Sequence, residues 1–465
     1  VYGHILRDIL RRKAHVLSPA AESVLALSGD LRGGPYAMLN ALQQDVTFPT
    51  IRDEEGKPVE LAFSNFSRYR GSPNRLVRKW AVEEFFGTLA KHKRSFAASL
   101  DMGVKRDVFV ARARQYESAL AASLDADHVP VEVFNLLLDT TAESLPRTLH
   151  RYVALRKRVM GLTDIHYYDL YAPLVPDTKQ RVRYDEATAL IDVALAPLGD
   201  DYRKALRTGM DLRSGWTDVF PNRGKRSGAY QTDVYGYHPF VFLNYMDELD
   251  DAFTTAHEFG HAMHSVLANA AQAYPNASPT IFLAEIASTF NEELLLHHLL
   301  GKAKSRAEKL ALLNKRLENI RTTVFRQIMF AEFERDIHAE VERGGALTAE
   351  RTSEIYRKLI EKYYGPEFKV CENDDVEWAY VPHFYYNFYV YKYATGLMSA
   401  IALSRRVLAG EKGAVTRYLD LLRAGGSDYP LVLLDRAGVG FQSPETMRQT
   451  FDLFDETITE FEALL

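Results

Sequence analysis

The stretch HEFGHAMH, residues 257–264, places three histidines and one glutamate within eight residues of a chain that has 14 His in 465 residues. Each residue of an α-helix advances by about 100°, so His257 and His261 lie on one face, one turn apart. Glu258 lies beside them. In this HExxH motif two neutral imidazoles bind zinc, and the carboxylate takes a proton from a water that the metal acidifies. The structural alternative is a buried histidine pair with ordinary protein partners.

The third ligand must come from elsewhere in the chain. His264 lies about 10.5 Å of helix rise beyond His257, too far for both to bind one ion, so we interpret it as a supporting or core residue. Direct contact of His264 with the metal is the alternative. Glu285, in FLAEIASTFNE, is the first acidic residue after the motif helix. It lies 24 residues beyond His261, enough for a helix end, a turn and an antiparallel return, so we expect it to be the ligand.

Glu292 lies two turns beyond Glu285 on a similar helix face. Buried there, it would hold a ligand histidine by its free ring nitrogen, whereas an exposed position is the alternative. Two histidines and one glutamate leave a coordination position open for water and substrate. That pattern is typical of a catalytic zinc site and not of a structural one.

Most of the chain around the motif has helical periodicity. Apolar residues recur at helical spacing from Ser72 to about Gly161, and helices resume at about Leu249. The next helix, TIFLAEIASTFNEELLLHHLL, is expected to be capped by Ser278 and to end before Gly301. A further long helix is expected over about 305–343.

Proline, glycine and aspartate interrupt the helical pattern between residues 171 and 183 and again between residues 213 and 236. The run PFVFLNY, residues 239–245, is rich in aromatic and β-branched residues and predicts a strand. We therefore expect a small sheet near 213–246. The loop PNRGKRSG, residues 221–228, lacks the spacing of a nucleotide-binding loop.

Composition narrows the possible partners. The chain is 47% hydrophobic and 26% charged with a net charge of −5, and it has no long basic block or membrane-length apolar run, so we expect neither nucleic acid nor a membrane as partner. The single cysteine, Cys371, excludes an internal disulfide, so a cytoplasmic location is expected. The chain opens with Val1 inside a helical pattern, so we expect its natural start to be missing.

Four blocks in order make the pattern specific. HEFGHAMHS is followed by FLAEIASTFNE, preceded by GAYQTDVYGYHPFVFLNY and followed later by PHFYYNFYVYKYATG. From about Phe48 to the C-terminus the chain closely resembles the oligoendopeptidase F branch of the thimet oligopeptidase-like zinc metallopeptidases. The resemblance implies a mostly α, two-lobed helical body, with a small β-sheet beside the HExxH helix and a deep substrate channel.

The resemblance also implies a division of the chain and the roles of the motif residues. Because family members usually carry a further N-terminal helical segment, residues 1–170 would form an incomplete helical lobe and residues 171–465 the catalytic region. By the resemblance, the general base is Glu258, and the ligands of one catalytic zinc ion are His257, His261 and Glu285.

The tyrosine-rich segment WAYVPHFYYNFYVYKYATG spans residues 378–396. Amide hydrolysis creates an oxyanion, which hydroxyl or imidazole donors stabilise together with the metal. If Pro382 opens a helix, then Tyr386 and Tyr393 fall on the side of His383. An aromatic stripe buried in the core is the structural alternative.

The resemblance implies that a histidine and tyrosines of this segment bind substrate carbonyls and the oxyanion. We therefore assign His383 and Tyr386 to this role, then Tyr393, with Tyr389 and Tyr391 as alternatives. Upstream, the backbone edge of Gly228, Ala229 and Tyr230 would bind an extended peptide, unless that edge is already paired.

Taken together, the sequence predicts a hydrolase, a zinc metalloprotease of the oligoendopeptidase type that cleaves internal bonds of short unstructured peptides. One alternative is a dipeptide-releasing metallocarboxypeptidase on a related helical scaffold. The other is a catalytically impaired remnant that binds peptides without cleaving them. The sequence makes no prediction of oligomeric state.

Overall fold

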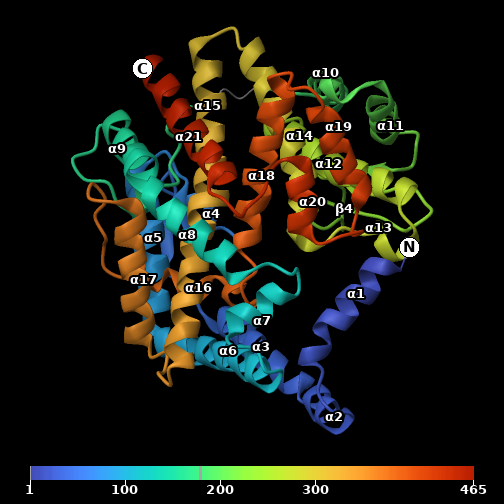
Figure 1. The fold of residues 1–465 in the computed structure, drawn as a ribbon. Coiled ribbons are helices and arrows are strands. Elements are labelled where there is room, and N and C mark those ends of the chain that lie inside the picture. Colours follow the sequence, from blue (N-terminus) through green and yellow to red (C-terminus); the bar gives the residue numbers. More distant parts are fainter. Residues whose placement is uncertain (1, 177–180) are drawn as a thin grey trace.

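The computed structural model describes residues 2–176 and 181–465 (Figure 1). It is mostly helical, as predicted, and has two small sheets. The elements before residue 170 are α1 (Gly3–Arg12), η1 (Lys13–His15), α2 (Pro19–Leu27), α3 (Gly29–Asp45), β1 (Thr50–Arg52), β2 (Pro58–Glu60), α4 (Phe66–Arg70), α5 (Arg75–Lys91), α6 (Lys93–Ala113), α7 (Ala119–Asp125), α8 (Val131–Ser144), η2 (Leu145–Arg147), α9 (Leu149–Val159) and η3 (Tyr167–Asp169).

The later elements carry the predicted site. They are α10 (Tyr184–Ala194), η4 (Ala196–Leu198), α11 (Asp200–Met210), β3 (Thr217–Asp218), β4 (Tyr230–Thr232), β5 (Phe240–Phe242), α12 (Leu249–Ala271), α13 (Tyr274–Ala277), α14 (Ile281–Lys302), α15 (Arg306–Ile320), the π turn η5 (Arg321–Phe325), α16 (Arg326–Glu342), α17 (Ala349–Tyr364), η6 (Asp374–Tyr380), η7 (Pro382–Tyr385), α18 (Tyr391–Leu408), α19 (Ala414–Ala424), α20 (Pro430–Ala437) and α21 (Glu445–Ala463).

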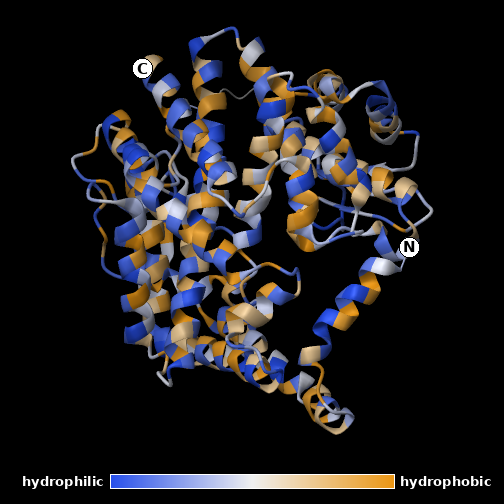
Figure 2. Ribbon diagram, viewed as in Figure 1, coloured by the Kyte–Doolittle hydropathy of each residue, from blue (hydrophilic) through white to orange (hydrophobic). Residues whose placement is uncertain are grey.

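The helices pack around one continuous core. In Figure 1, α10 to α14 and α18 to α20 lie on one side, and α5, α6, α8, α9, α16 and α17 lie on the other. The core begins with Leu39 of α3 and ends with Phe461 of α21. Hydrophobic and hydrophilic residues are interspersed along α1 as along the body helices (Figure 2), yet α1 buries none of its side chains. Across the two described ranges, none of the helices has the length and apolar character needed to cross a membrane.

Three helices of the predicted site approach one another closely. A Cβ atom at Gly260 of α12 would lie 2.4 Å from the Ala287 carbonyl oxygen of α14, so only glycine permits this crossing. On the other side of α14, a Cβ atom at Gly396 of α18 would lie 3.2 Å from the Glu285 Cβ. Thus α14 is held between α12 and α18.

The predicted small sheet is present and lies next to α12. Its strand order is β3-β5-β4, with β3 parallel and β4 antiparallel to β5, and Tyr230 pairs with Phe242. The strand predicted at 239–245 is observed as β5. A second, two-stranded sheet of β1 and β2 was not predicted.

Two helix boundaries differ from the prediction. Ser278 is the C-cap of the short helix α13, and the N-cap of α14 is Thr280 and not Ser278. Gly301 lies inside the last turn of α14 and not beyond it. The long helix predicted over 305–343 is present as α15 and α16, but a π turn joins them.

Candidate metal centre

The helix α12, which carries the HExxH motif, has a well-capped N-terminus. Asp251 accepts a hydrogen bond from the Glu248 backbone N–H at 3.0 Å, and acidic groups in the first turn complement the positive end of the helix. The helix then runs without interruption to Ala271, so His257 and His261 project from one face.

The donor atoms of three side chains converge beside α12. The Nε2 atoms of His257 and His261 are 3.2 Å apart, and Glu285 Oε2 lies 3.4 Å from the first and 3.6 Å from the second. Tetrahedral zinc with bonds of about 2.0–2.1 Å places its ligand atoms about 3.3 Å apart. The spacing and the donor set therefore fit one zinc-sized ion, and α14 supplies Glu285 by the antiparallel return that was predicted.

The charges of these groups are strongly coupled. Burial alone would lower the pKa of His257, but hydrogen bonds to Glu285 and Glu292 raise it to about 10. Burial lowers the pKa of His261 to about 4. Burial would raise the pKa of Glu285, but His257 and His261 lower it to about 2. The shifts favour a proton shared between His257 and Glu285, and a metal ion bound by these groups would take the place of that proton.

Each of the two motif histidines also makes a hydrogen bond to a neighbouring residue on α14. His257 Nδ1 donates to Glu292 Oε1 at 2.6 Å, which leaves its Nε2 facing Glu285. The His261 ring hydrogen-bonds the Ala284 backbone carbonyl. Such partners fix ring orientation and tautomer in metal sites. Glu292 contacts the free ring nitrogen of His257, as expected for the first of its two interpretations.

Glu258 is buried on the flank of the cluster that faces the sheet. Burial, together with the negative charges of Glu285 and Glu292, raises its pKa to about 7. The backbone N–H of Gln231 donates to its carboxylate. Because β4 is an edge strand of its sheet, this N–H points away from β5. Gln231 was not singled out in the sequence, since nothing local relates it to the motif.

His264 lies outside the cluster. Within residues 2–176 and 181–465, the one group of side chains able to hold a metal ion contains His257, His261 and Glu285. His264 is 4% exposed, burial lowers its pKa to about 4, and its Nε2 has no hydrogen-bond partner among the described residues. Its position agrees with the interpretation as a core or supporting residue.

The tyrosine segment forms an aromatic cluster around His383. The ring centre of His383 lies 5.6 Å from that of Tyr386, 6.0 Å from that of Tyr393 and 6.5 Å from that of Tyr389. Tyr393 is close enough to Glu285 for that carboxylate to contribute to its raised pKa, after burial and Tyr389. The cluster therefore adjoins the candidate ligands.

The predicted helix from Pro382 is wrong, although the predicted neighbours are together. Residues Pro382–Tyr385 form a 3-10 turn, and α18 begins only at Tyr391. Between them Asn387 and Phe388 have φ of 52° and 57°, a left-handed conformation that cannot continue a helix. The bend, and not helical spacing, brings Tyr386 and Tyr393 to the same side.

The bend is held by side chains from two helices that are distant in the sequence, α16 and α7. Glu334 Oε1 of α16 accepts from the Phe388 backbone N–H at 2.9 Å, and Ser123 Oγ donates to the Asn387 carbonyl at 2.6 Å. Burial raises the pKa of Glu334 to about 8. Neither Glu334 nor Ser123 carries a sequence signal that could have revealed this role.

Two tyrosines of the segment lie in the core and not in the cluster around His383, and one tyrosine from outside the segment contacts that cluster. Tyr391 is buried against Phe134 and Phe282, and Tyr385 donates to Ser99 Oγ at 3.1 Å in the core. Tyr36 of α3, which the sequence did not suggest, has its hydroxyl 3.0 Å from that of Tyr386.

The predicted peptide-binding edge lies at the start of β4. Gly228 has φ of 91°, and its carbonyl accepts from Asn244 Nδ2 at 2.8 Å. Ala229 packs against the core, while the Tyr230 ring is 54% exposed and stacks on Phe242. The far edge of β4 carries the N–H that reaches Glu258, so this edge leads to the candidate metal centre.

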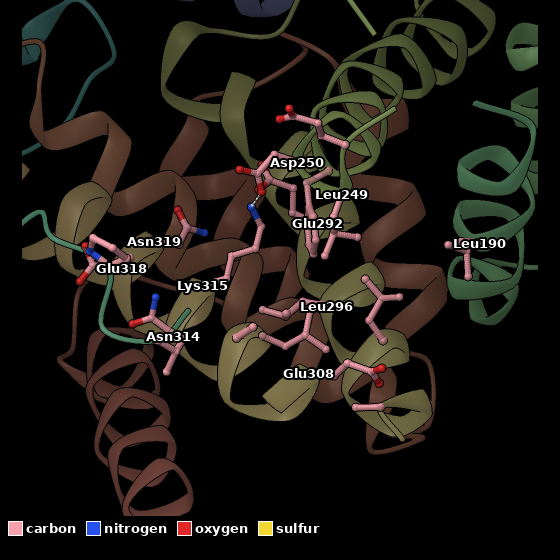
Figure 3. A pocket seen from close by; sticks show the side chains of 18 of the residues that line it. Leu190, Leu249, Asp250, Glu292, Leu296, Glu308, Asn314, Lys315, Glu318 and Asn319 are labelled. Atoms are coloured by element: carbon pink, nitrogen blue, oxygen red, sulfur yellow. Dashed lines mark hydrogen bonds and ion pairs between the residues drawn. The ribbon is translucent and has the colours of Figure 1, made fainter. Parts of the chain in front are cut away.

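A cavity of about 1070 Å³ borders the centre (Figure 3). Its wall includes Glu292, and it extends over the first turn of α12 and along α15. Figure 3 shows Lys315 of α15 directed at Asp250 of α12, with Nζ 2.6 Å from the carboxylate. This volume exceeds the roughly 300–1,000 Å³ typical of small-molecule pockets.

Comparison with known proteins agrees with this geometry. The model of Peptidase family M3 matches residues 68–453, and a model described as Oligopeptidase F matches residues 1–48. Oligopeptidase PepF of Bacillus subtilis (strain 168) is 42% identical over 466 residues, which cover 100% of this chain and 69% of the relative. An oligoendopeptidase F homolog of Lactococcus lactis subsp. lactis (strain IL1403) is 38% identical and is covered to 77%.

Solved structures agree at the level of the fold. The crystal structure of oligoendopeptidase-F from Enterococcus faecium has a TM-score of 0.82 and 34% identity, covering 100% of this chain and 78% of that one. A peptidase structure from Chlamydophila abortus has a TM-score of 0.94 and 35% identity with the same coverage. With a family match over most of its length and an HExxH helix facing a glutamate on the next helix, this chain belongs to peptidase family M3, a family of metallopeptidases.

Proposed function

We propose that this protein is a zinc-dependent endopeptidase that hydrolyses internal bonds of short, unstructured oligopeptides. The observation that carries the proposal is the set of donor atoms from His257, His261 and Glu285, which lie 3.2 to 3.6 Å apart. A zinc ion held by them would supply a Lewis acid that acidifies water and polarises the scissile carbonyl. Two histidines and one glutamate are a catalytic donor set, because one coordination position stays open.

Glu258 is the proposed general base. It lies next to His257 on α12, is buried, and is oriented by the Gln231 N–H, so its carboxylate is fixed beside the position of an attacking water. It would take a proton from that water and then deliver it to the leaving amine.

The aromatic cluster is the proposed oxyanion partner. His383, Tyr386 and Tyr393 have N–H and O–H groups within one cluster, and Tyr393 adjoins Glu285. These donors would hydrogen-bond the substrate carbonyl oxygen as negative charge develops on it, which stabilises the transition state more than the bound substrate.

The proposed substrate class follows from the sheet edge and from the relatives. An extended peptide added to the edge of β4 would be held by main-chain hydrogen bonds, with Gly228, Ala229 and Tyr230 at its entry, and would need no particular sequence. The relatives' names, oligopeptidase and oligoendopeptidase, support short peptides as substrates. We also propose a cytoplasmic location, on the basis of the single cysteine.

The test is mass spectrometry of a mixture of short and long peptides incubated with the zinc-loaded protein, with Glu258→Gln as the blank. Internal cuts that decline with peptide length and are absent from the blank support the proposal. Release of dipeptides only from free C-termini would support a carboxypeptidase instead. Bound zinc and bound peptide without any cut would indicate a binding protein.

A further inference from the structure

A second cluster of charges surrounds Tyr171, outside the candidate metal ligands. The guanidinium carbons of Arg70, Arg321 and Arg326 lie 3.8, 4.6 and 5.9 Å from the centre of the Tyr171 ring. They come from α4, the π turn and α16. We refer to these four residues as the Tyr171 cluster. One aromatic ring thus has three cations around it, an arrangement that needs negative charge nearby.

The π turn between α15 and α16 makes this convergence possible. The Arg326 N–H donates to the Arg321 carbonyl, five residues back. In a regular α-helix, residues five apart point about 140° away from each other. The wider turn places them one turn apart, so both can reach Tyr171. Turns of this kind are rare inside helices and are frequent at functional sites.

The carboxylates around the cluster do not balance its charge. Glu318 accepts from Arg321 Nη2 at 2.7 Å and also pairs with Arg156, whereas Glu377 pairs with Arg326. Among the described residues, four arginines, counting Arg70, therefore face two carboxylates, which leaves two positive charges (4 − 2).

The neighbouring groups within residues 2–176 and 181–465 add no negative charge. The Asp169 carboxylate is already shared by Arg75 and Arg78, and the hydrogen bonds of Arg70 to described residues go to the hydroxyls of Tyr167 and Tyr380. A buried charge without a counter-charge is strongly unfavourable. The excess positive charge therefore calls for an anion.

The cluster also has hydrogen-bond donors without acceptors. The Nη1 atoms of Arg321 and Arg326 and the Tyr171 hydroxyl are shut off from solvent and have no partner within the described part of the chain. The same holds for the Nε of Arg156, which lies outside the cluster and shares Glu318 with Arg321. Arg321 is 1% exposed and Arg156 is fully buried. Because arginine can only donate, the group missing here is an acceptor.

We propose that the Tyr171 cluster binds one small monovalent anion of the halide class. Its unpartnered donors are closed to solvent, which favours a small ion over the carboxylate end of a peptide. Burial alone would raise the pKa of the Tyr171 hydroxyl, but the three arginines lower it, so the site attracts negative charge strongly. Arg326 also contributes, after burial, to the lowered pKa of His383, so His383 would respond to the bound anion.

The test uses the zinc-loaded protein in chloride-free buffer. Thermal unfolding is followed while sodium chloride or bromide replaces sodium gluconate at constant ionic strength, with sodium formate as a small-carboxylate arm. A Tm that rises and saturates with halide is expected, because a ligand that binds only the folded state stabilises it. Bromide should also give an anomalous diffraction peak beside the Tyr171 hydroxyl. A response to formate alone would overturn the halide assignment.

Two variants make the test specific. Tyr171→Phe keeps the ring and removes only the hydroxyl, and it should weaken the halide midpoint by about tenfold, the usual effect of losing a hydrogen bond to a charged group. Arg316→Gln on α15 is the control, because Arg316 is also buried with an unpartnered Nε but faces only Glu293, at 3.9 Å. It should keep the wild-type halide response.

An unchanged halide midpoint in folded Tyr171→Phe, or no bromide at the cluster, would overturn the proposal. Neither readout depends on peptide cleavage. A failure here is therefore distinguishable from a failure of the proposed peptidase function.

Discussion

The two halves of the candidate site are built differently. The donor atoms of the metal half project from α12 and α14, two uninterrupted helices that cross at Gly260. The aromatic half lies on a 3-10 turn, a left-handed bend and the first turn of α18. A regular helix converts spacing in sequence into spacing in space, whereas a bend depends on the distant groups that hold it. The arrangement of the first half was therefore predicted from helical spacing, whereas for the second half the neighbouring residues were predicted but not the backbone that brings them together.

The largest effect should come from breaking the helix crossing of the metal half. Gly260→Ala would place a methyl group 2.4 Å from the Ala287 carbonyl oxygen, so α12 and α14 must separate. We expect a loss of about 3 kcal/mol in the free energy of unfolding and loss of zinc binding. Chemical denaturation and metal analysis measure both.

Gly301→Ala is the matched control for this change. Gly301 lies in the last turn of α14, and an added Cβ there has nothing within 4 Å. Because alanine favours helix over glycine, the free energy of unfolding should stay the same or rise by up to about 1 kcal/mol. Equal losses in the two variants would mean that the crossing is not what positions the ligands.

Removing single hydroxyls tests the aromatic half. Tyr393→Phe or Tyr386→Phe should lower kcat roughly a hundredfold with little change in KM, because an oxyanion donor acts mainly in the transition state. Steady-state kinetics on a fluorogenic peptide gives both constants. In the control Tyr391→Phe the lost hydroxyl is buried away from the cluster, so kcat should be unchanged.

A smaller loss of zinc affinity is expected when the partner of a candidate ligand is changed. Glu292→Gln weakens the hydrogen bond that orients His257, so zinc affinity should fall about 10- to 100-fold. Competition with a chromophoric chelator measures this affinity. The neighbouring Glu293 is buried and faces Arg316, so Glu293→Gln should bind zinc as the wild type does. Equal affinities for the Glu292 variant and the wild type would show that the contact is only structural.

A further effect concerns the support of the bend and depends on pH. Burial raises the pKa of Glu334 from 4.5 to about 8, so the folded protein holds a proton that the unfolded chain releases between these values. The contribution of Glu334 to stability is therefore complete below about pH 4.5 and is lost as pH rises to about 8. Relative to Glu334→Gln, the wild type should lose up to about 1.4 kcal/mol per pH unit in this window.

Denaturant unfolding of both proteins between pH 5 and 8 measures the difference. The side-chain amide oxygen in Glu334→Gln can still accept from the Phe388 N–H, so the variant is expected to fold. Parallel pH profiles for the two proteins would mean that Glu334 titrates as an ordinary exposed carboxylate.

The mostly helical fold, the sheet near 213–246 and the family were predicted from the sequence and are confirmed. Glu285 was located because two helices and a turn fix its level opposite His261. The contacts that were missed join residues far apart in the chain, such as Tyr36 with Tyr386 and Glu334 with Phe388. Periodicity carries no information about such pairs.

The π turn was missed for a related reason. Residues 305–343 have an uninterrupted helical pattern, and a single extra residue in one turn leaves that pattern intact. The helix predicted from Pro382 is wrong for a different reason, because the chain bends at Asn387 and Phe388. Asparagine often adopts the left-handed conformation, but Phe388 is not of such a type and no glycine marks the bend, which partners distant in the sequence hold.

The central claim is that Glu285 binds the catalytic metal and Glu258 moves the proton. The most direct measurement compares Glu258→Gln with Glu285→Gln for bound zinc after dialysis and for cleavage of one peptide. We expect Glu258→Gln to keep one zinc per chain while cleavage falls about 10²- to 10⁴-fold, and Glu285→Gln to lose both. Wild-type cleavage by Glu258→Gln, or full zinc retention by Glu285→Gln, would contradict the account.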